Sequence, residues 1–531
     1  MKAHKTIPFQ KTGYFSKIIC DYLDRKENLS EFYDNYPDIK GFEKQIKNKR
    51  DSFSDSSRNV LVSSLDNQYQ DLSISDKTKV NINLLKQNNT FTVATGHQLN
   101  LYTGPLYFLY KIVSAINLAK QLSKEFTDCN FVPVYWMATE DHDFEEIQYF
   151  NFKNIKINWN RESQGAVGRL TNKGLESVFQ ELSKLLGKSK SATFLKELFS
   201  DAYLQHDNLT DATRYLANEL FGEYGLVIID GDDKKLKQQF TPFVKEELLQ
   251  NTSFKEVLKT IEKLEKNYKV QVNPREINLF YLDDNLRERI IFEEDIYKVN
   301  NTKIVFTKEE ILIELNKYPE KFSPNVLLRP LYQEVILPNL CYIGGGGEIA
   351  YWFELKKYFE AVKVPFPILL LRNSVLLVTE KQSEKMQKLN ISKEEIFNKQ
   401  DVLIDSKVKS ISEISIDFSS QRLYLENMFR DLEELSNKTD KSFLGAVKAQ
   451  EKKQLKGIDN LEKRMLKAQK RKYNEIVSRI AVLQDELFPN QSLQERQTNF
   501  SEFYLRYGND LIKCLIEDLD PLRLELDVIV L

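Results

Sequence analysis

A short acidic segment that contains one histidine is the part of the sequence best suited to chemistry. Five acids and the histidine fall within seven residues, at Glu140, Asp141, His142, Asp143, Glu145 and Glu146. Carboxylates this close together repel one another unless a cation or a basic partner lies near, which argues against a purely structural role. A carboxylate beside a histidine can fix its tautomer and tune it as a general base. We therefore predict that residues 140–143 are catalytic.

The same segment is open to two other interpretations. Asp141, His142 and Asp143 have the ligand types that divalent metal ions accept, so a metal-dependent hydrolase is an alternative function. The acids could also belong to an ordinary helix N-terminus, in a chain that serves as a non-catalytic coiled-coil scaffold. Our main interpretation assigns no metal site.

A glycine-containing segment upstream is predicted to bind substrate. It runs TGHQLNLYTGPLYFLYK and lies between a predicted strand and a predicted helix. Glycine allows close backbone approach, and the N-terminus of the following helix suits an anion. The segment matches neither GxxxxGK[ST] nor GxGxxG. The residues that we expect to contact substrate here, together with the tryptophan that precedes the acidic segment, are His97, Gln98, Gly104, Lys111 and Trp136.

A run of four glycines marks a third candidate region. The chain has only 18 glycines, and Gly344, Gly345, Gly346 and Gly347 are consecutive. Glycines that open a helix are costly unless the backbone must approach a ligand, so we predict a loop that binds phosphate or an oxyanion. Glu348 and Tyr351 are three residues apart on one predicted helix face. Arg329 and Arg372 are candidate clamps for a carboxylate or phosphate.

The elements that position these segments indicate an α/β fold. Apolar runs at 91–95, 131–136, 226–230 and 366–371 predict buried strands, and residues 107–121 predict an amphipathic helix. Short apolar strands separated by helices are typical of a parallel, doubly wound sheet. Ligands bind such sheets at the carboxyl ends of the strands, where the acidic and glycine segments are expected.

Beyond about residue 380 the composition changes to Lys, Glu, Gln and Leu. Leu425, Met428, Leu432 and Leu435 are spaced by 3, 4 and 3, which predicts long helices in a coiled coil or helical hairpin with a break near Lys472. Residues 448–472 are strongly basic, and we interpret them as a solvated helix face. We therefore divide the chain into a core at 1–380 and a helical coiled-coil domain at 381–531.

Composition narrows the class of protein. The 531 residues carry a formal net charge of −2, which argues against general nucleic-acid binding. Four widely separated cysteines fit a reducing compartment. No apolar run approaches the roughly 20 residues that span a bilayer. We expect a soluble cytoplasmic protein with no membrane or nucleic-acid partner.

The segments quoted above, with VPVYWMATEDHDFEEI, LLRPLYQEVILPNLCYIGGGGEIAYW and PFPILLLRNS in that order, resemble the cysteine ligase family of bacillithiol biosynthesis. The resemblance covers nearly the whole chain. It implies a Rossmann-like parallel-sheet core with helical connecting inserts, at about 155–215 and 250–325, and a coiled coil that forms a homodimer. It also implies addition of cysteine to the amine of glucosaminyl malate, the last step of bacillithiol formation. The cofactor stays open: amide synthesis needs activation, so ATP or ADP is a candidate, although HIGH, KMSKS and P-loop sequences are missing.

The resemblance leads to a working set of roles. Arg329 or Arg372 would hold a carboxylate. His142 or Asp141 would accept the proton of the attacking amine. His97, Gln98 and the glycine backbone at 344–347 would cradle a phosphate or the developing oxyanion.

Overall fold

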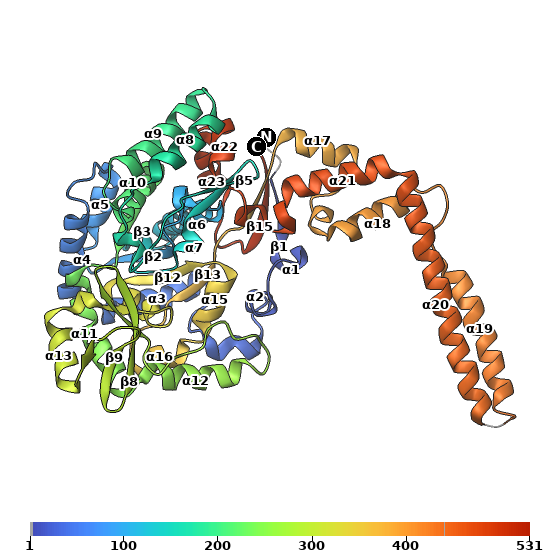
Figure 1. Ribbon diagram of the computed structural model, residues 1–531, viewed down its shortest axis with the longest axis horizontal. Helices are drawn as coiled ribbons and strands as arrows, with labels where there is room; N and C mark the ends of the chain where they lie inside the picture. Colours follow the sequence, from blue (N-terminus) through green and yellow to red (C-terminus); the bar gives the residue numbers. More distant parts are fainter. Residues whose placement is uncertain (1–3, 440) are drawn as a thin grey trace.

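The computed structural model describes residues 4–439 and 441–531, and its centre is a five-stranded sheet in the order β13-β12-β2-β3-β6 (Figure 1). The strands are β2 (Thr90–His97), β3 (Asn130–Met137), β6 (Val227–Asp230), β12 (Asn339–Gly344) and β13 (Ile368–Leu371). All four pairings between neighbouring strands are parallel. The predicted α/β class with a Rossmann-like parallel sheet is confirmed.

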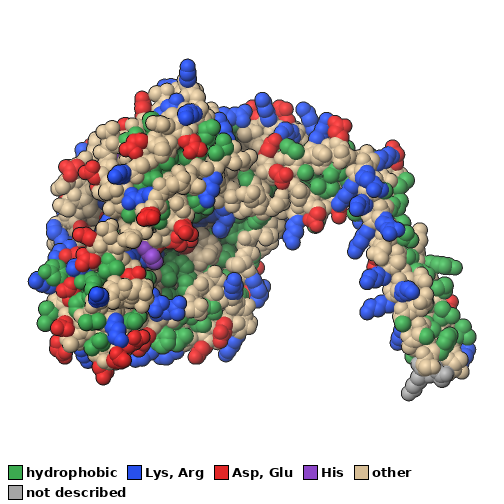
Figure 2. Space-filling view, viewed as in Figure 1, with side chains coloured by type: hydrophobic (Ala, Val, Ile, Leu, Met, Phe, Trp, Pro, Cys, Tyr) green, Lys and Arg blue, Asp and Glu red, His purple; other side chains and the backbone are tan. Residues whose placement is uncertain are grey.

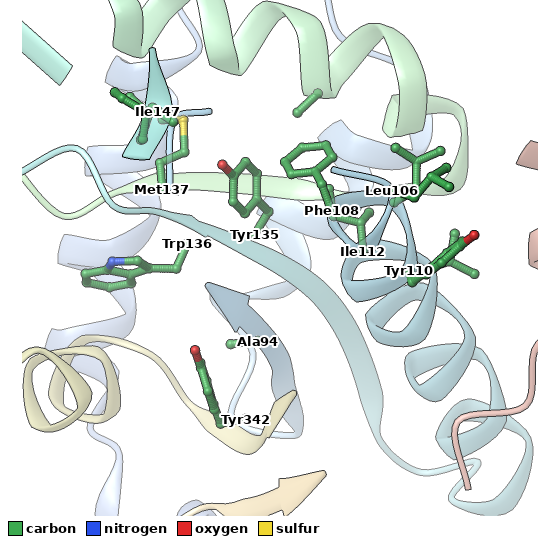
Figure 3. Packing of buried hydrophobic residues seen from close by; sticks show 14 of the residues in the cluster. Ala94, Leu106, Phe108, Tyr110, Ile112, Tyr135, Trp136, Met137, Ile147 and Tyr342 are labelled. Atoms are coloured by element: carbon green, nitrogen blue, oxygen red, sulfur yellow. The ribbon is translucent and has the colours of Figure 1, made fainter. Parts of the chain in front are cut away.

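Helix α6 (Tyr107–Glu125) carries the chain from β2 back to the start of β3. Successive side chains of β3 point to opposite faces of the sheet, as strand geometry requires. Figure 3 shows Tyr135 on the side of Phe108 in α6 and Trp136 on the other side, with Tyr342. The rings of Tyr135 and Phe108 lie 5.4 Å apart. Burial on both faces explains why these strands are continuous apolar runs.

The four predicted strands and the predicted helix are present, with ends that move by a few residues. Strand β12, in the interior of the sheet, was not predicted. Pro338 precedes it and the glycine run follows it, so its apolar signal is short and interrupted. Its residues are nevertheless all buried.

Two segments between core strands form separate structures. After β3 and the short helix α7 (Phe144–Ile147), the chain forms a hairpin and then a helical layer, in the elements β4 (Tyr149–Phe152), β5 (Ile155–Asn158), α8 (Leu175–Leu186), α9 (Lys190–Leu204) and α10 (Leu209–Phe221). The second segment forms an antiparallel sheet in the order β10-β9-β8-β7-β11. It follows α11 (Lys234–Gln250), and its elements are α12 (Thr252–Leu264), β7 (Leu279–Asp283), β8 (Leu286–Glu293), β9 (Ile296–Val299), β10 (Val305–Phe306), α13 (Lys308–Lys317) and β11 (Phe322–Pro324). We call this second segment, residues 250–325, the β-insert.

Further helices surround the core. Those before β2 are α1 (Phe9–Thr12), α2 (Lys17–Leu23), α3 (Ile39–Ser52), α4 (Asp55–Gln68) and α5 (Asp76–Leu84), and those around β12 are α14 (Leu328–Ile336), α15 (Gly346–Phe353) and α16 (Lys356–Ala361). A third sheet joins both ends of the chain, in the order β1 (His4–Pro8), β15 (Glu525–Val530) and β14 (Val375–Val378). The sequence analysis assigned only helices beyond residue 380, so β15 is a difference. Its residues from Leu526 on are buried, and it pairs with β1 on one side and β14 on the other.

The remaining helices extend from the core as an arm (Figure 1). They are α17 (Glu380–Lys388), α18 (Gln400–Ile411), α19 (Ser419–Ser436), α20 (Lys441–Lys472) and α21 (Asn474–Leu487), and α22 (Ser501–Tyr507) and α23 (Asp510–Asp518) return to the core. Helices α19 and α20 lie side by side as a helical hairpin. Helix α20 ends at Lys472, where a break was predicted. In the described residues, no helix is both long and apolar enough to cross a bilayer.

The seam of the hairpin differs from the predicted stripe. Leu425 and Leu432 are half-buried, but Phe429 is the buried apolar residue of α19, while Met428 and Leu435 are exposed. An offset of four residues places Phe429 over Leu425, whereas the 3–4 spacing selected a neighbouring face. The apolar residues left over lie on the arm's surface, among the many Lys and Arg side chains that Figure 2 shows there.

Candidate active site

A cavity of about 710 Å³ opens at the carboxyl ends of β2, β3 and β12. Its walls come from the core strands, from α14 and α15, from the β-insert and from a segment that follows the arm. Thirteen of the predicted site residues line it: His97, Gln98, Lys111, Trp136, Glu140, Asp141, His142, Arg329, Gly345, Gly347, Glu348, Tyr351 and Arg372. The topology thus brings together three segments that lie up to 275 residues apart.

Four predicted residues lie outside this lining: Asp143, Gly104, Gly344 and Gly346. Asp143 is exposed at the start of α7 and lines an adjoining groove with Asp141, His142, Glu145 and Glu146. Gly344 ends β12, and a Cβ there would lie 3.0 Å from Cβ of Glu348. Gly346 instead faces Ile19 of α2. None of these four residues therefore lines the cavity.

Gly104 serves the turn before α6 instead. Its φ of +61° is in the left-handed region, and a Cβ would lie 2.6 Å from Cβ of Asn100. Its carbonyl accepts a 2.6 Å hydrogen bond from Nδ2 of Asn499, in the segment that follows the arm. Gly104 thus anchors the C-terminal part of the chain to the core.

The cavity is strongly cationic. Seven Lys or Arg residues line it, against three carboxylates. Lys111 pairs with Glu348 at 2.6 Å, Arg372 with Glu495 at 2.7 Å, and Arg287 lies 3.9 Å from Asp141. Within residues 4–439 and 441–531, the other four have no carboxylate within 4.0 Å, and these are Arg275, Arg289, Arg329 and Arg496. Such an excess of unpaired guanidinium groups fits a ligand with several negative charges.

Asp141 is held as a carboxylate at the cavity wall. One oxygen accepts the backbone N–H of His142 at 2.7 Å, and the other accepts Nε2 of Gln98. Burial acts to raise the pKa of Asp141, but the hydrogen bonds from Gln98 and from the backbone N–H of His142, together with the charge of Arg287, outweigh it and lower the pKa. A carboxylate held in this way is a fixed acceptor for a substrate N–H group.

His142 has its tautomer set by the β-insert. Nη1 of Arg287 lies 2.6 Å from Nδ1 of His142. Arginine can only donate hydrogen bonds, so Nδ1 accepts and the ring carries its proton on Nε2. Arg287 itself is fixed by Ser323 at 3.2 Å and by stacking over Phe280 at 4.1 Å. In this arrangement His142 presents a donor rather than a base to the cavity.

Glu140 is engaged in a buried ion pair. Its carboxylate accepts a hydrogen bond from Nζ of Lys237 in α11, and Lys237 also donates to the Phe322 carbonyl at 2.8 Å. The pair connects the end of β3 to the β-insert. Its contacts support a positioning role for Glu140.

Lys111 and Glu348 form the floor of the cavity. Nζ of Lys111 donates to the Gly96 carbonyl at 2.7 Å. Glu348 also accepts the Tyr342 hydroxyl at 2.7 Å and the Gly345 N–H at 2.8 Å, which caps α15. Burial acts to raise the pKa of Glu348, but Lys111 lowers it below its usual value. The floor therefore carries a charged pair that fixes β2 against α15.

His97 is buried beside this floor. Burial, and then the charge of Lys111, lower its pKa to about 3, so the ring is neutral near neutral pH. Nε2 of His97 has no hydrogen-bond partner in the described part of the chain. A neutral ring brings no positive charge to an anion. The structure therefore favours the arginines over His97 for the predicted phosphate or oxyanion contact.

Sequence reasoning missed several lining residues, above all Arg275, Arg287, Arg289 and Arg496. One signal was available: Arg287 and Arg289 alternate along β8, so both face the same side of the insert sheet. Nothing in the local sequence places that side over the acidic segment.

The metal-dependent alternative finds no geometric support. Among the residues that the structure describes, no three His, Cys, Asp or Glu side chains gather in an arrangement that could hold a metal ion. The donors of the acidic segment have other partners: Glu140 pairs with Lys237, and Asp141 binds Gln98.

Comparison with known proteins agrees with this architecture. Residues 1–373 match the family model "Bacillithiol biosynthesis BshC, N-terminal Rossmann-like domain", and residues 375–531 match "Bacillithiol biosynthesis BshC, C-terminal coiled-coil domain". Relatives described as "Putative cysteine ligase BshC" are 60% identical in Flavobacterium johnsoniae, over 98% of this chain and 99% of the relative, and 37% identical in Cytophaga hutchinsonii, over 97% and 96%. Among solved structures, one described as a "putative arginyl t-RNA synthetase" from Campylobacter jejuni is matched over 84% of this chain and 98% of its own, at 9% identity and a TM-score of 0.23. The chain belongs to the BshC family of bacillithiol biosynthesis.

Proposed function

We propose that this protein is a ligase that joins the carboxyl group of cysteine to the amine of glucosaminyl malate, forming the amide of bacillithiol in the last step of its synthesis. The cationic cavity with one fixed carboxylate, Asp141, carries the proposal. Both substrates bring carboxylates, and the acceptor also brings an amine. Unpaired arginines match the carboxylates, and Asp141 matches the amine.

Arg329 is the residue that we assign to the cysteine carboxylate. Its guanidinium donates to Gln333 at 3.1 Å and lies 3.5 Å from the Tyr351 hydroxyl. It lies 5.9 Å from the Trp136 ring and 5.5 Å from the Tyr342 ring. These contacts orient the group but leave its charge uncompensated, so a bidentate bond to a substrate carboxylate completes it.

Asp141 is assigned to the attacking amine. Each carboxylate oxygen can accept two hydrogen bonds, and the backbone of residue 142 and Gln98 do not use them all. The remaining acceptor capacity orients an amine N–H. His142, which carries its proton on Nε2, donates to the substrate from the cavity rim.

The reaction forms a C–N bond and breaks a C–O bond at the cysteine carboxyl carbon. The amine gives its proton to Asp141 or to water, and the departing oxygen leaves on a phosphate group, for which a nucleoside triphosphate is the candidate co-reactant. Oxyanion charge develops on the carbonyl oxygen during attack. The N-terminus of α15, at Gly347, and the cavity arginines are the groups that stabilise it.

The test is reconstitution with purified full-length protein, cysteine and glucosaminyl malate, with and without ATP, and mass detection of the amide. Asp141→Asn should lower the rate at least 100-fold, since the residue fixes the nucleophile. Glu145→Gln, an exposed acid four residues away and outside the main cavity, is the matched control and should retain the wild-type rate. Absence of product in every condition, or an Asp141→Asn variant as fast as Glu145→Gln, rejects the assignment.

We also propose that two copies associate through the arm. Several large apolar side chains of the hairpin are exposed, namely Leu423, Tyr424, Leu435 and Leu461. Apolar groups on one helical surface are a common basis for helix–helix association. Light scattering of the wild type and of Leu423→Lys/Leu435→Lys tests this: a dimer that becomes a monomer supports it, and a wild-type monomer at micromolar concentration rejects it.

A further inference from the structure

The segment that follows the arm contributes directly to the cavity. A short turn, η8 (Gln494–Arg496), lies against β14. Gln494 accepts the Leu377 N–H at 3.0 Å and donates to the Leu377 carbonyl at 3.1 Å. Glu495 is buried and accepts the Val375 N–H at 3.1 Å. These hydrogen bonds to the backbone of β14 fix the turn on the core. The next residue, Arg496, lines the cavity.

Arg496 and Arg372 both line the cavity, and the charges of both act on Tyr107. Nη2 of Arg372 donates to Glu495 at 2.7 Å, and the Arg372 guanidinium lies 5.1 Å from the Tyr107 ring. Burial raises the pKa of Tyr107, Glu348 adds to that effect, and the charges of Arg372 and Arg496 oppose it. Both guanidinium groups thus lie close to one tyrosine.

This end of the cavity has donors without acceptors. Nε of Arg372 is buried and has no hydrogen-bond partner within the described residues. A Cβ at Gly345 would lie 3.8 Å from that atom, so Nε faces the start of α15. The first N–H groups of a helix have no partner inside the helix, and within residues 4–439 and 441–531 only that of Gly345 is capped, by Glu348. Arg496 adds a guanidinium that no carboxylate neutralises in the described part of the chain.

We propose that Arg496, Nε of Arg372 and the N-terminus of α15 form an oxyanion subsite, and that Arg496 is a substrate-binding residue supplied by the C-terminal part of the chain. Arg372 belongs to the part of the chain that matches the Rossmann-like model, and Arg496 to the part that matches the coiled-coil model. Neither part alone holds the complete subsite. The group that it takes is a carboxylate or a phosphate, because guanidinium forks and helix N-termini bind both.

The inference rests on the proposed function only for the source of that group. If the bound group is a carboxylate, it belongs to the malyl end of the acceptor. If it is a phosphate, it belongs to the activated cysteine. Free malate and inorganic phosphate separate these two sources, and binding of either one can be measured without turnover.

The experiment is titration calorimetry of the full chain with malate and, separately, with inorganic phosphate. Wild type should bind one of them, and Arg496→Ala should weaken that binding 10- to 100-fold, as expected for loss of a charge-assisted bond. Arg506→Ala removes the same charge from an exposed position outside the cavity and should change binding less than twofold. Thermal unfolding of both variants should match the wild type, because both side chains are exposed.

Two outcomes overturn the subsite: wild type that binds neither probe at millimolar concentration, or an Arg496→Ala variant that binds as tightly as Arg506→Ala. These outcomes are distinguishable from failure of the ligase proposal. Loss of probe binding in Arg496→Ala, in a protein that makes no amide, would keep the subsite and reject the reaction.

Discussion

Replacement of Arg329 by methionine should separate substrate binding from stability, because this guanidinium has no carboxylate partner in the described structure. A substrate carboxylate would give it a bidentate, charge-assisted bond. Such bonds contribute about 1.5–3 kcal/mol, which corresponds to roughly a 10- to 150-fold loss of kcat/KM for cysteine when the side chain is removed. Methionine keeps most of the apolar contact with the Trp136 and Tyr342 rings.

The effect on stability should have the opposite sign to that of an ordinary buried arginine. In the absence of ligand, Arg329 is a partly buried charge whose hydrogen-bond partners in the described residues are two neutral oxygens, those of Gln333 and Tyr351. Removing an uncompensated charge leaves the free energy of unfolding unchanged or raises it by about 1 kcal/mol.

Arg58 provides the matched control. It is also buried and also lacks a carboxylate partner in the described residues, but it donates to the carbonyls of Leu85, Asn88 and Thr90 at 3.0–3.3 Å. Arg58→Met leaves three carbonyls without a donor and should lower the free energy of unfolding by about 3 kcal/mol, at about 1 kcal/mol each. Urea unfolding and steady-state kinetics measure both effects. The reasoning is refuted if Arg329→Met is destabilised like Arg58→Met and keeps the wild-type KM for cysteine.

Three further predictions concern charged groups at or near the cavity. Lys111→Met leaves Glu348 without its ion pair and should lower the free energy of unfolding in urea by about 3 kcal/mol. The double variant Lys111→Met/Glu348→Gln should recover most of that stability. A Lys111→Met variant as stable as the wild type would contradict this prediction. The pKa of Asp141 is lowered in the folded protein, so its contribution to stability is present above about pH 4 and is lost as the pH falls. In thermal unfolding, Asp141→Asn should therefore lose less stability than the wild type as the pH falls below about 4. The same loss of stability in both proteins would argue against this prediction. Burial, and then Asp232, raise the pKa of Asp230 to about 6, so its stabilising effect is present below about pH 4 and is lost as pH rises through 6. Asp230→Asn should therefore be more stable than wild type at pH 7, by up to about 3 kcal/mol at about 1.4 kcal/mol per pKa unit, and equal to it at pH 4; the reverse order would refute the assignment.

The fold was predictable where a buried strand appears in the sequence as a continuous run of apolar residues. Strands β2, β3, β6 and β13 are covered on both faces, so their sequences are apolar runs that can be found without a structure. Strand β12 is just as buried, but Pro338 and the glycine run interrupt its signal. Strand β15 was missed for another reason: its partners are β1 and β14, the former more than 500 residues away in sequence.

The candidate site was predictable in part for the same reason. Residues at the carboxyl ends of parallel strands meet at one edge of the sheet, and this rule placed His97, Asp141 and Glu348 in one cavity. The rule does not extend to the β-insert or to the turn after the arm. The contact between Arg287 and His142 joins residues 145 apart in sequence, so the tautomer of His142 could not be inferred from its neighbours.

The four unpaired arginines raise a physical question about how the fold tolerates them. Like charges around one cavity repel, so other contacts must hold the segments that carry them. Buried Glu354 accepts the N–H groups of Gln271 and Val272 at 2.7 and 3.4 Å and thereby fixes the stretch that leads to Arg275. Glu495 does the same beside Arg496. Buried carboxylates that anchor backbone next to uncompensated arginines, rather than neutralise them, indicate a site shaped for an anionic ligand rather than for the stability of the empty protein.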